Sequence, residues 1–296
     1  MSLSYIPLAH RSLIAVGGED RRTFLQGLVS NDVTKAGEGF TLYGAFLTPQ
    51  GKFLHDFFLG ERDDTLLLSC ETGRRADFLK RLSLYKLRSK VTIAAADDLR
   101  VFALVGDGAA AALGLPDEAG ATKTFCGGVA FVDPRLPAAG LRAWLPQGAE
   151  AELAKAGFAA AEASVWDALR IGLGLPDGSR DMAPDKAILL ENGFDELHGV
   201  DWQKGCYMGQ ELTARTKYRG LIKRRLLPVK IDGPPPEEGT PILLGDTEVG
   251  EMRSHCGDEG LAMIRVEAFE QIVREGGVLR AASTVLTARK PDWVVL

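Results

Sequence analysis

Residues 42–60, LYGAFLTPQGKFLHDFFLG, hold two apolar runs around the tetrapeptide Thr48-Pro49-Gln50-Gly51. Proline fixes one turn dihedral and glycine can adopt positive φ, so the tetrapeptide predicts a tight turn between two strands. A strand (residues 13–16) and a helix (19–28) precede this hairpin, and a strand (65–70), a helix (74–87) and a strand (89–95) follow it. The order β-α-β-β-β-α-β predicts an α+β unit with helices on one face of a mainly antiparallel sheet.

A similar order of elements begins at Leu99. Strand patterns cover residues 101–105, 127–134 and 141–146, and helix patterns cover residues 106–115 and the stretches that begin at Glu150 and Ser164. Past Gly220 the chain has short strand-like runs separated by proline and glycine, which exclude long helices. We therefore expect an N-terminal α+β region over residues 1–220, with two units that meet near residue 98, and a small all-β domain over residues 221–296.

Composition excludes several classes of protein. The chain has 296 residues, 46% of them hydrophobic, without an uninterrupted apolar run of the ~20 residues that a membrane-spanning helix needs. Its net charge of −5 disfavours direct nucleic-acid binding, which depends on neutralising phosphates. The N-terminus MSLSYIPLAHR resembles neither a signal peptide nor an arginine-rich transit peptide. We expect a cytoplasmic protein that contacts neither membranes nor nucleic acid.

The four cysteines, at positions 70, 126, 206 and 256, lie far apart and have no CxxC or CxH partner. This spacing argues against a metal site built within one chain. The stretch GDGAAA (residues 106–111) imitates a dinucleotide-binding loop, but the acid that would hold a ribose is missing until Asp133. An ordinary strand-to-helix turn is the better interpretation of that stretch.

The octapeptide KGCYMGQE, residues 204–211, places a lone thiol between a lysine and glycines. The glycines predict a tight loop that leads into a helix, QELTARTKYR, and Gly220 would end this helix. Cys206, before a helix N-terminus and near Lys204, would have a stabilised thiolate, which suits a nucleophile or a metal ligand. Glu211 and Arg215 can pair on one helical face. The alternative for a single cysteine is a small buried apolar residue.

Two further patterns leave alternatives open. Seven cations and no acid lie between Leu212 and Ile231, which fits either a solvated charge run or an anion site for carboxylate or phosphate groups. His55 and Asp56 are neighbours in a predicted strand, so they should point to opposite faces of the sheet. Both fit either a functional pocket or a polar interruption of an apolar strand, and a buried Asp56 would need a partner.

The octapeptide resembles the signature KGC[FY]xGQE of the YgfZ-type folate-binding proteins, which are related to the aminomethyltransferase (T-protein) of the glycine cleavage system. The stretches FLQGLVSNDV (24–33), AFLTPQGKFLHDF (45–57), YKLRSKV (85–91) and RIGLGLPDG (170–178) resemble successive blocks of that family in the same order. The resemblance implies two ferredoxin-like α/β units around a central folate cavity, followed by a C-terminal β-barrel. It also implies that the protein binds tetrahydrofolate or a one-carbon derivative of it.

The resemblance further implies a role in the assembly, maintenance or repair of iron-sulfur enzymes, including those that modify tRNA. The partners would be such enzymes or their assembly proteins. The alternative within the same superfamily is a folate-dependent aminomethyltransferase. Aminomethyltransferases carry paired aspartates, one of them catalytic, in the strand that holds Asp56, whereas this chain has His55 at the first position. Asp56 is therefore a candidate catalytic residue.

Carried over by position, Cys206 matches the signature cysteine. The motif and the residues near it would bind the cofactor: Lys204, Tyr207, Gln210, Glu211 and Arg215. Glu191, in LLENGF, falls at the glutamate that hydrogen-bonds the pterin ring in the wider family, a task for which a carboxylate suits because it accepts two N–H bonds. Cys206 would act as a transient cluster ligand or in redox or one-carbon chemistry. With no second cysteine nearby, a cluster shared with a partner is more plausible than one held by this chain.

Overall fold

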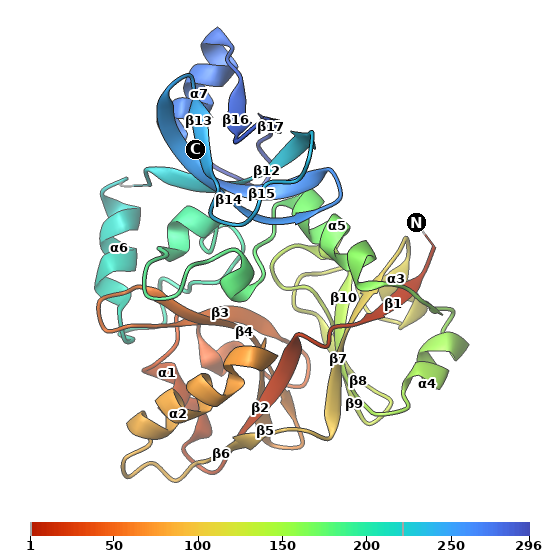
Figure 1. Cartoon of the computed structure of the whole chain (residues 1–296). Coiled ribbons are helices and arrows are strands. Elements are labelled where there is room, and N and C mark those ends of the chain that lie inside the picture. Colours follow the sequence, from red (N-terminus) through yellow and green to blue (C-terminus); the bar gives the residue numbers. More distant parts are fainter. Residues whose placement is uncertain (1, 221) are drawn as a thin grey trace.

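The computed structural model describes residues 2–220 and 222–296, whose strands form two open sheets and a closed barrel (Figure 1). The first sheet is antiparallel in the order β3-β4-β5-β2-β6. Its elements are β2 (Arg11–Gly17), α1 (Arg21–Gln26), η1 (Val33–Lys35), β3 (Leu42–Leu47), β4 (Phe53–Arg62), β5 (Thr65–Glu71), η2 (Thr72–Arg74), α2 (Arg75–Tyr85) and β6 (Thr92–Ala95). The predicted β-α-β-β-β-α-β order is confirmed.

The hairpin formed by β3 and β4 fits closely against a later part of the chain. Its turn glycine, Gly51, adopts a φ of +81°, and a Cβ atom there would lie 2.6 Å from the backbone oxygen of Gly209. A larger residue would therefore be strained by its backbone conformation and by its neighbour. The turn thus holds the loop that precedes α6 (Gln210–Tyr218).

The second sheet has the order β11-β1-β7-β10-β9-β8. Strand β1 comes from the N-terminus and pairs with β7 and β11, so residues on both sides of the predicted boundary near 98 build this unit. The helix expected over residues 106–115 is only four residues long, because Gly106, Gly108 and Gly114 adopt positive φ. The elements are β1 (Ser4–Pro7), β7 (Leu99–Val105), α3 (Ala109–Ala112), β8 (Thr122–Phe125), β9 (Gly128–Val132), η3 (Pro137–Ala139), β10 (Leu141–Pro146), α4 (Glu150–Lys155), β11 (Ala159–Ala160) and α5 (Ala163–Leu173).

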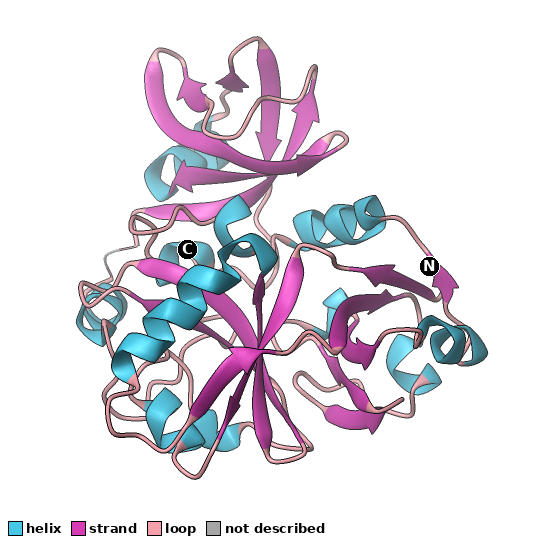
Figure 2. Cartoon of the chain, turned by 60° about the horizontal axis from the view of Figure 1, so that its bottom comes forward, coloured by secondary structure: helices cyan, strands magenta, loops and turns pink. Residues whose placement is uncertain are grey.

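The C-terminal region is a closed barrel in the order β12-β15-β14-β13-β16-β17, and it forms a lobe at the top of both views (Figures 1 and 2). The expectation of an all-β domain is wrong in one element, the helix α7 (Val266–Glu275). Its apolar residues Ala268, Phe269 and Ile272 recur at helical spacing and pack on the barrel core. The strands are β12 (Arg224–Asp232), β13 (Pro241–Leu244), β14 (Thr247–Cys256), β15 (Glu259–Arg265), β16 (Leu279–Ala281) and β17 (Thr284–Ala288).

Apolar cores lie on both faces of the two open sheets. The inner faces, with Phe58 from β4, Phe131 from β9 and Trp144 from β10, pack against each other. Helices α1 and α2 cover the outer face of the first sheet, and α3 and α4 cover that of the second. The predicted α+β class and the C-terminal barrel are confirmed. Among the described residues, the helices are too short or too polar to cross a membrane.

Candidate functional site

The loop that contains the octapeptide lies on the residues that follow α1. The Lys204 ammonium donates hydrogen bonds to the backbone carbonyls of Gln26 and Val29, the latter at 2.7 Å. The backbone N–H of Met208 donates to the carbonyl of Gly27 at 3.0 Å, and the Asn31 amide donates to the carbonyl of His198 at 2.7 Å. Two segments of the chain that are 175 residues apart in the sequence, at Val29 and Lys204, therefore lie in contact and form one local structure.

Lys204 acts mainly as a clamp for this loop. Burial lowers its pKa to about 8, and its ammonium lies 5.0 Å from the centre of the Tyr207 ring. Two carbonyl acceptors and the aromatic ring occupy the charged group. Its place explains why a lysine stands at this position, but Lys204 does not line the pocket described below.

Cys206 is exposed, four positions before α6 begins. Its neighbour Gly205 has a φ of +88°, so the loop turns sharply beside the thiol. In the described part of the chain no group of three or more His, Cys, Asp or Glu side chains could hold a metal ion. Cys70 is buried, and burial raises the pKa of its thiol to about 12. Cys206 is thus an accessible thiol, and the alternative of a buried apolar residue fits Cys70 instead.

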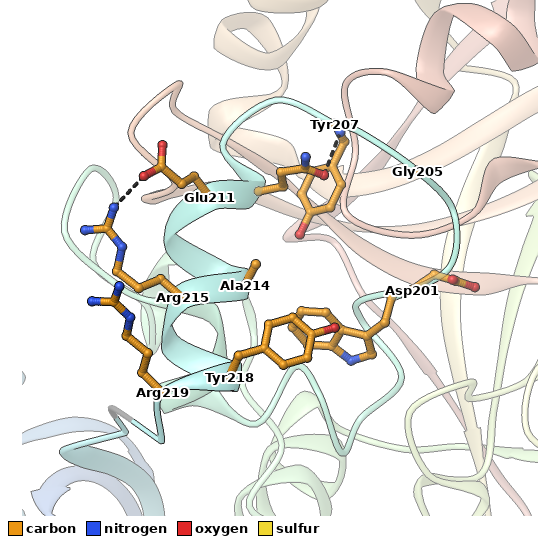
Figure 3. A pocket seen from close by; sticks show the side chains of 10 residues that line it. Asp201, Gly205, Tyr207, Glu211, Ala214, Arg215, Tyr218 and Arg219 are labelled. Atoms are coloured by element: carbon orange, nitrogen blue, oxygen red, sulfur yellow. Dashed lines mark hydrogen bonds and ion pairs between the residues drawn. The ribbon is translucent and has the colours of Figure 1, made fainter.

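A pocket of about 590 Å³ lies between this loop and α6 (Figure 3). We call it the α6 pocket. Four of the predicted cofactor residues line it: Tyr207, Gln210, Glu211 and Arg215. The remaining lining residues were not predicted: Asp201, Trp202, Gly205, Ala214, Tyr218 and Arg219. Tyr218 could have been found from the sequence, because positions 211, 214 and 218 of the expected helix recur at helical spacing.

The α6 pocket has opposite charges at its two sides. Figure 3 shows Asp201 on the same side of α6 as Tyr207 and Tyr218, whereas Arg215 and Arg219 extend from the other side at the outer rim. Burial would raise the pKa of Asp201, but its hydrogen bonds with Lys35 and with the Gln203 backbone keep that pKa below its usual value. Asp201 is therefore an ionised acceptor at one side of the pocket.

Aromatic rings form the middle of the pocket. The rings of Trp202 and Tyr218 meet edge to face with 5.9 Å between their centres. The Trp202 indole N–H donates to Asp195 at 2.8 Å, which fixes the ring. Tyr218 is 75% exposed, so one face of its ring is free for a ligand. Glu211 and Arg215 form the predicted ion pair.

Glu191 does not line the α6 pocket. It lies in the short helix η5 (Leu189–Asn192), is 5% exposed, and has Arg224 from the start of the barrel 3.3 Å from one carboxylate oxygen. The structure therefore separates Glu191 from Tyr207, Gln210, Glu211 and Arg215. Its role as a pterin acceptor stays a prediction that requires Arg224 to move.

Asp56 lies between the two sheets and is 2% exposed. Arg11 donates to one of its oxygens at 2.9 Å, and the Tyr43 hydroxyl lies 3.3 Å from the other. Burial would lower the pKa of Arg11, but Asp56 and Asp177 raise it above its usual value. Both carboxylate oxygens of Asp56 are thus engaged within the chain, which favours a structural role for this residue.

His55 points to the opposite face of the first sheet, as predicted. Its ring stacks on Phe78 with 4.5 Å between centres, and its Nε2 lies 2.9 Å from Asp77. Burial, with a smaller effect of Arg74, lowers the pKa of His55 to about 4 despite the nearby Asp77. His55 is therefore neutral at physiological pH.

Further charged side chains fill the space between the sheets. Asp133 accepts from Arg135 at 2.8 Å and from Arg142 at 3.1 Å. The guanidinium of Arg142 lies 4.1 Å from the centre of the Phe58 ring and 4.7 Å from that of Trp166. The predicted cofactor residues that share a pocket lie beside α6 and not between the two sheets. The central folate cavity therefore stays a prediction. The sequence alone does not show that these arginines pair with Asp133, since the pairing depends on the folded chain.

The fold and the barrel define a class of protein. The chain has the fold of the glycine cleavage system aminomethyltransferase T from Bartonella henselae, with a TM-score of 0.75 and 18% identity over 99% of this chain and 86% of that one. Residues 223–296 match the family described as CAF17, C-terminal beta-barrel domain. The class is thus an aminomethyltransferase-like fold with a CAF17-type barrel.

Sequence relatives narrow this class. The chain is 33% identical to the human iron-sulfur cluster assembly factor IBA57, mitochondrial, over 96% of this chain and 83% of that protein. The mouse IBA57 protein is 31% identical over the same shares, and the Neurospora crassa homologue is 33% identical over 75% of this chain and 52% of its own length. The chain belongs to the IBA57 family of iron-sulfur cluster assembly factors.

These relatives correct one expectation and refine another. The cytoplasmic location is wrong, because the relatives are named as mitochondrial proteins and point to mitochondria instead. The implied relation to the aminomethyltransferase fold and to iron-sulfur cluster assembly is confirmed. The YgfZ signature and folate binding stay predictions.

Proposed function

We propose that this protein is an iron-sulfur cluster assembly factor that binds reduced folate in the α6 pocket and presents the Cys206 thiol beside it. The observation that carries the proposal is the position of Cys206, which is exposed between two residues, Gly205 and Tyr207, that line the pocket. The relatives' role in cluster assembly supports the first part of the proposal.

The α6 pocket fits a folate in size and in the order of its groups. Its volume of about 590 Å³ lies within the usual range for small-molecule sites. Asp201 lines the pocket although its side chain is only 9% exposed, and its oxygens already accept from Lys35 and from the Gln203 backbone. Each oxygen keeps a second lone pair that can accept an N–H bond from the amino-pyrimidine edge of a pterin, and Trp202 and Tyr218 can stack on aromatic rings. Arg215 and Arg219 suit the carboxylates of the glutamate tail. Tetrahydrofolate, when bound, would supply nitrogen atoms that carry one-carbon units.

Cys206 would contribute one thiolate to a cluster that is otherwise held by a partner protein. The thiol loses its proton when it binds iron, and the other ligands come from the partner, because residues 2–220 and 222–296 contain no group of three or more His, Cys, Asp or Glu side chains that could hold a metal ion. Hydrogen bonds from Lys204 and Met208 hold the loop against the residues that follow α1, which places Cys206 beside the α6 pocket. The clients would include iron-sulfur enzymes that modify tRNA.

The alternative function, aminomethyl transfer, is supported by the fold but not by the site. A general base for this reaction needs a carboxylate that the substrate can reach. Asp56 is buried and bound to Arg11 and Tyr43. We therefore rank transfer chemistry below a role in cluster assembly.

Calorimetric titration with tetrahydrofolate tests the folate site. Asp201→Asn should weaken binding roughly tenfold, because a charged acceptor typically contributes about 1.5–3 kcal/mol. Asp258→Asn, which removes an exposed carboxylate on the barrel, is the matched control and should bind as the native protein does. Absence of tetrahydrofolate binding by the native protein would refute the folate part of the proposal.

Complementation tests the thiol. In a strain that lacks this protein, Cys206→Ser should fail to restore the activity of iron-sulfur enzymes, whereas Cys126→Ser, another exposed cysteine, should restore it. Full restoration by Cys206→Ser would remove the thiol from the mechanism.

A further inference from the structure

The cations of the stretch that begins at Arg215 are not all paired. Most of them have an acidic partner: Arg215 with Glu211, Lys217 with Asp195, Arg224 with Glu191, Arg225 with Glu196 and Lys230 with Asp258. The side chains of Arg219 and Lys223 make no hydrogen bond or ion pair with any residue that the structure describes. Both are exposed. They are therefore free to bind an anion from outside the chain.

The three cations Arg215, Arg219 and Lys223 follow one another at intervals of four residues. Figure 3 shows the side chains of Arg215 and Arg219 extending in the same direction, one above the other. Lys223 lies further along, where the chain enters the barrel, because its carbonyl accepts from the Val266 N–H at 3.0 Å. We call these three residues the cation row. It starts at the rim of the α6 pocket and continues beyond it.

A folate with a single glutamate cannot use the whole row. Its two carboxylates belong to one residue, and Arg215 and Arg219 at the rim are sufficient for them. Lys223 does not line the pocket. Additional carboxylates would have to emerge from the pocket along the row to reach Lys223.

Poly-γ-glutamate has carboxylates at a suitable spacing. Each γ-linked unit adds five bonds to the chain, so successive α-carboxylates are roughly 6 Å apart when the tail is extended. Residues four apart on a helix lie about one turn, or roughly 5.4 Å, apart along its axis. The spacing of Arg215 and Arg219 on α6 therefore matches that of successive γ-glutamyl units.

We propose that the cation row selects folates that carry a poly-γ-glutamate tail, with Arg215 and Arg219 at the first carboxylates and Lys223 at a later one. This inference rests on the proposed folate site and adds the form of folate that occupies it. The row also gives the tail a direction, from the α6 pocket toward the barrel. Long tails would thus bind more tightly than the monoglutamate without any change in the pocket itself.

Calorimetry under anaerobic conditions tests the inference with two probes, tetrahydrofolate monoglutamate and tetrahydrofolate triglutamate. The native protein should bind the triglutamate roughly 1.5-fold to fivefold more tightly, since the longer tail adds one exposed ion pair, at Lys223, and such a pair contributes a factor of roughly 1.5 to 5. Lys223→Gln should remove this preference and leave the affinity for the monoglutamate unchanged. Lys223→Arg should restore the preference.

Lys155→Gln in α4 is the matched control, because it removes an exposed lysine charge from the other side of the fold. It should keep the full preference for the triglutamate. Raising the salt concentration should reduce the preference, since exposed charges are screened over roughly 10 Å at 0.1 M salt.

The possible outcomes separate this inference from the proposed function. Equal affinity for the two probes, or an equal loss of preference in Lys155→Gln and Lys223→Gln, would overturn the cation row and leave the folate site intact. Failure of both probes to bind would overturn both. A preference that depends on Lys223 but not on Lys155 supports both.

Discussion

Arginine and carboxylate side chains meet in two regions of this protein with different consequences. Between the two sheets, Asp133 binds Arg135 and Arg142, and each of these side chains is at most 2% exposed. Beside α6, Arg215 pairs with Glu211 while 51% of its side chain is exposed. A buried charge must be paired within the chain, because water cannot solvate it, whereas an exposed charge can exchange its partner for a ligand. The first region therefore holds the fold together, and the second can bind.

The same difference between buried, paired charges and exposed ones separates the residues that the family resemblance implies into two groups. Asp56 and Glu191 correspond to the carboxylates expected to serve catalysis and pterin binding, yet each is bound to an arginine and is at most 5% exposed. Four residues of the octapeptide, Gly205, Tyr207, Gln210 and Glu211, instead line an accessible pocket beside the exposed thiol. Position in a motif indicated candidate residues, and only exposure and partners showed which of them a ligand can reach.

The largest effect on stability is expected from the substitution Asp133→Asn. It would leave Arg135 and Arg142 buried without their counter-charge, which typically costs about 3–5 kcal/mol of the free energy of unfolding. Urea denaturation followed by circular dichroism measures this loss. Asp258→Asn, on the surface of the barrel, should change the stability little. Similar effects of the two substitutions would show that the buried network does not stabilise the fold as we argue.

A somewhat smaller effect on the free energy of unfolding is expected when His55 is protonated at low pH. Its pKa is about 4 in the folded protein, below the ordinary value of 6.5, so the unfolded chain binds a proton that the folded chain does not. Stability should therefore fall as the pH decreases from about 6.5 to 4, by about 3 kcal/mol from this group.

Denaturation at several pH values compares the native protein with His55→Gln, which should lack this part of the pH dependence. His255→Gln, at an exposed histidine, is the control and should retain it. An unchanged slope in His55→Gln would mean that His55 is not held neutral by burial.

A still smaller effect concerns ligand affinity. Trp202→Ala removes one of the aromatic walls of the α6 pocket, and loss of a stacking contact should weaken tetrahydrofolate binding by about 1 kcal/mol, or roughly fivefold. Titration calorimetry measures this change. Tyr85→Ala, at a half-exposed aromatic residue that does not line the pocket, should not alter the affinity. Equal binding by Trp202→Ala would place the folate elsewhere.

The smallest effect on stability is expected from Cys206→Ser. The thiol is exposed and free, so the free energy of unfolding should change by less than about 0.5 kcal/mol. Cys70→Ser should cost more, because it places a hydroxyl in a buried apolar site. A large loss of stability in Cys206→Ser would indicate a structural cysteine and would weaken the proposed function.

Local patterns were sufficient for much of the fold. The turn residues at Pro49 and Gly51 predicted the hairpin, and the helix after Gly209 followed from its sequence. Helix α7 was missed because neighbouring glycine and proline residues suggested strands and turns only. The pairing of β1 with β7 was not predicted, since nothing local to residues 4–7 shows which sheet they join.

The sequence by itself determined the class of fold, the loop with its thiol, and four of the residues that line the α6 pocket. Only the tertiary structure decided which charges are buried and paired and which are free. Asp201 and Trp202 join the pocket because Lys204 and Asn31 hold the loop against the end of α1. Burial and ion pairing depend on contacts between distant segments, and their free energies change with the local exposure to water. These properties therefore could not be predicted from the spacing of residues along the chain.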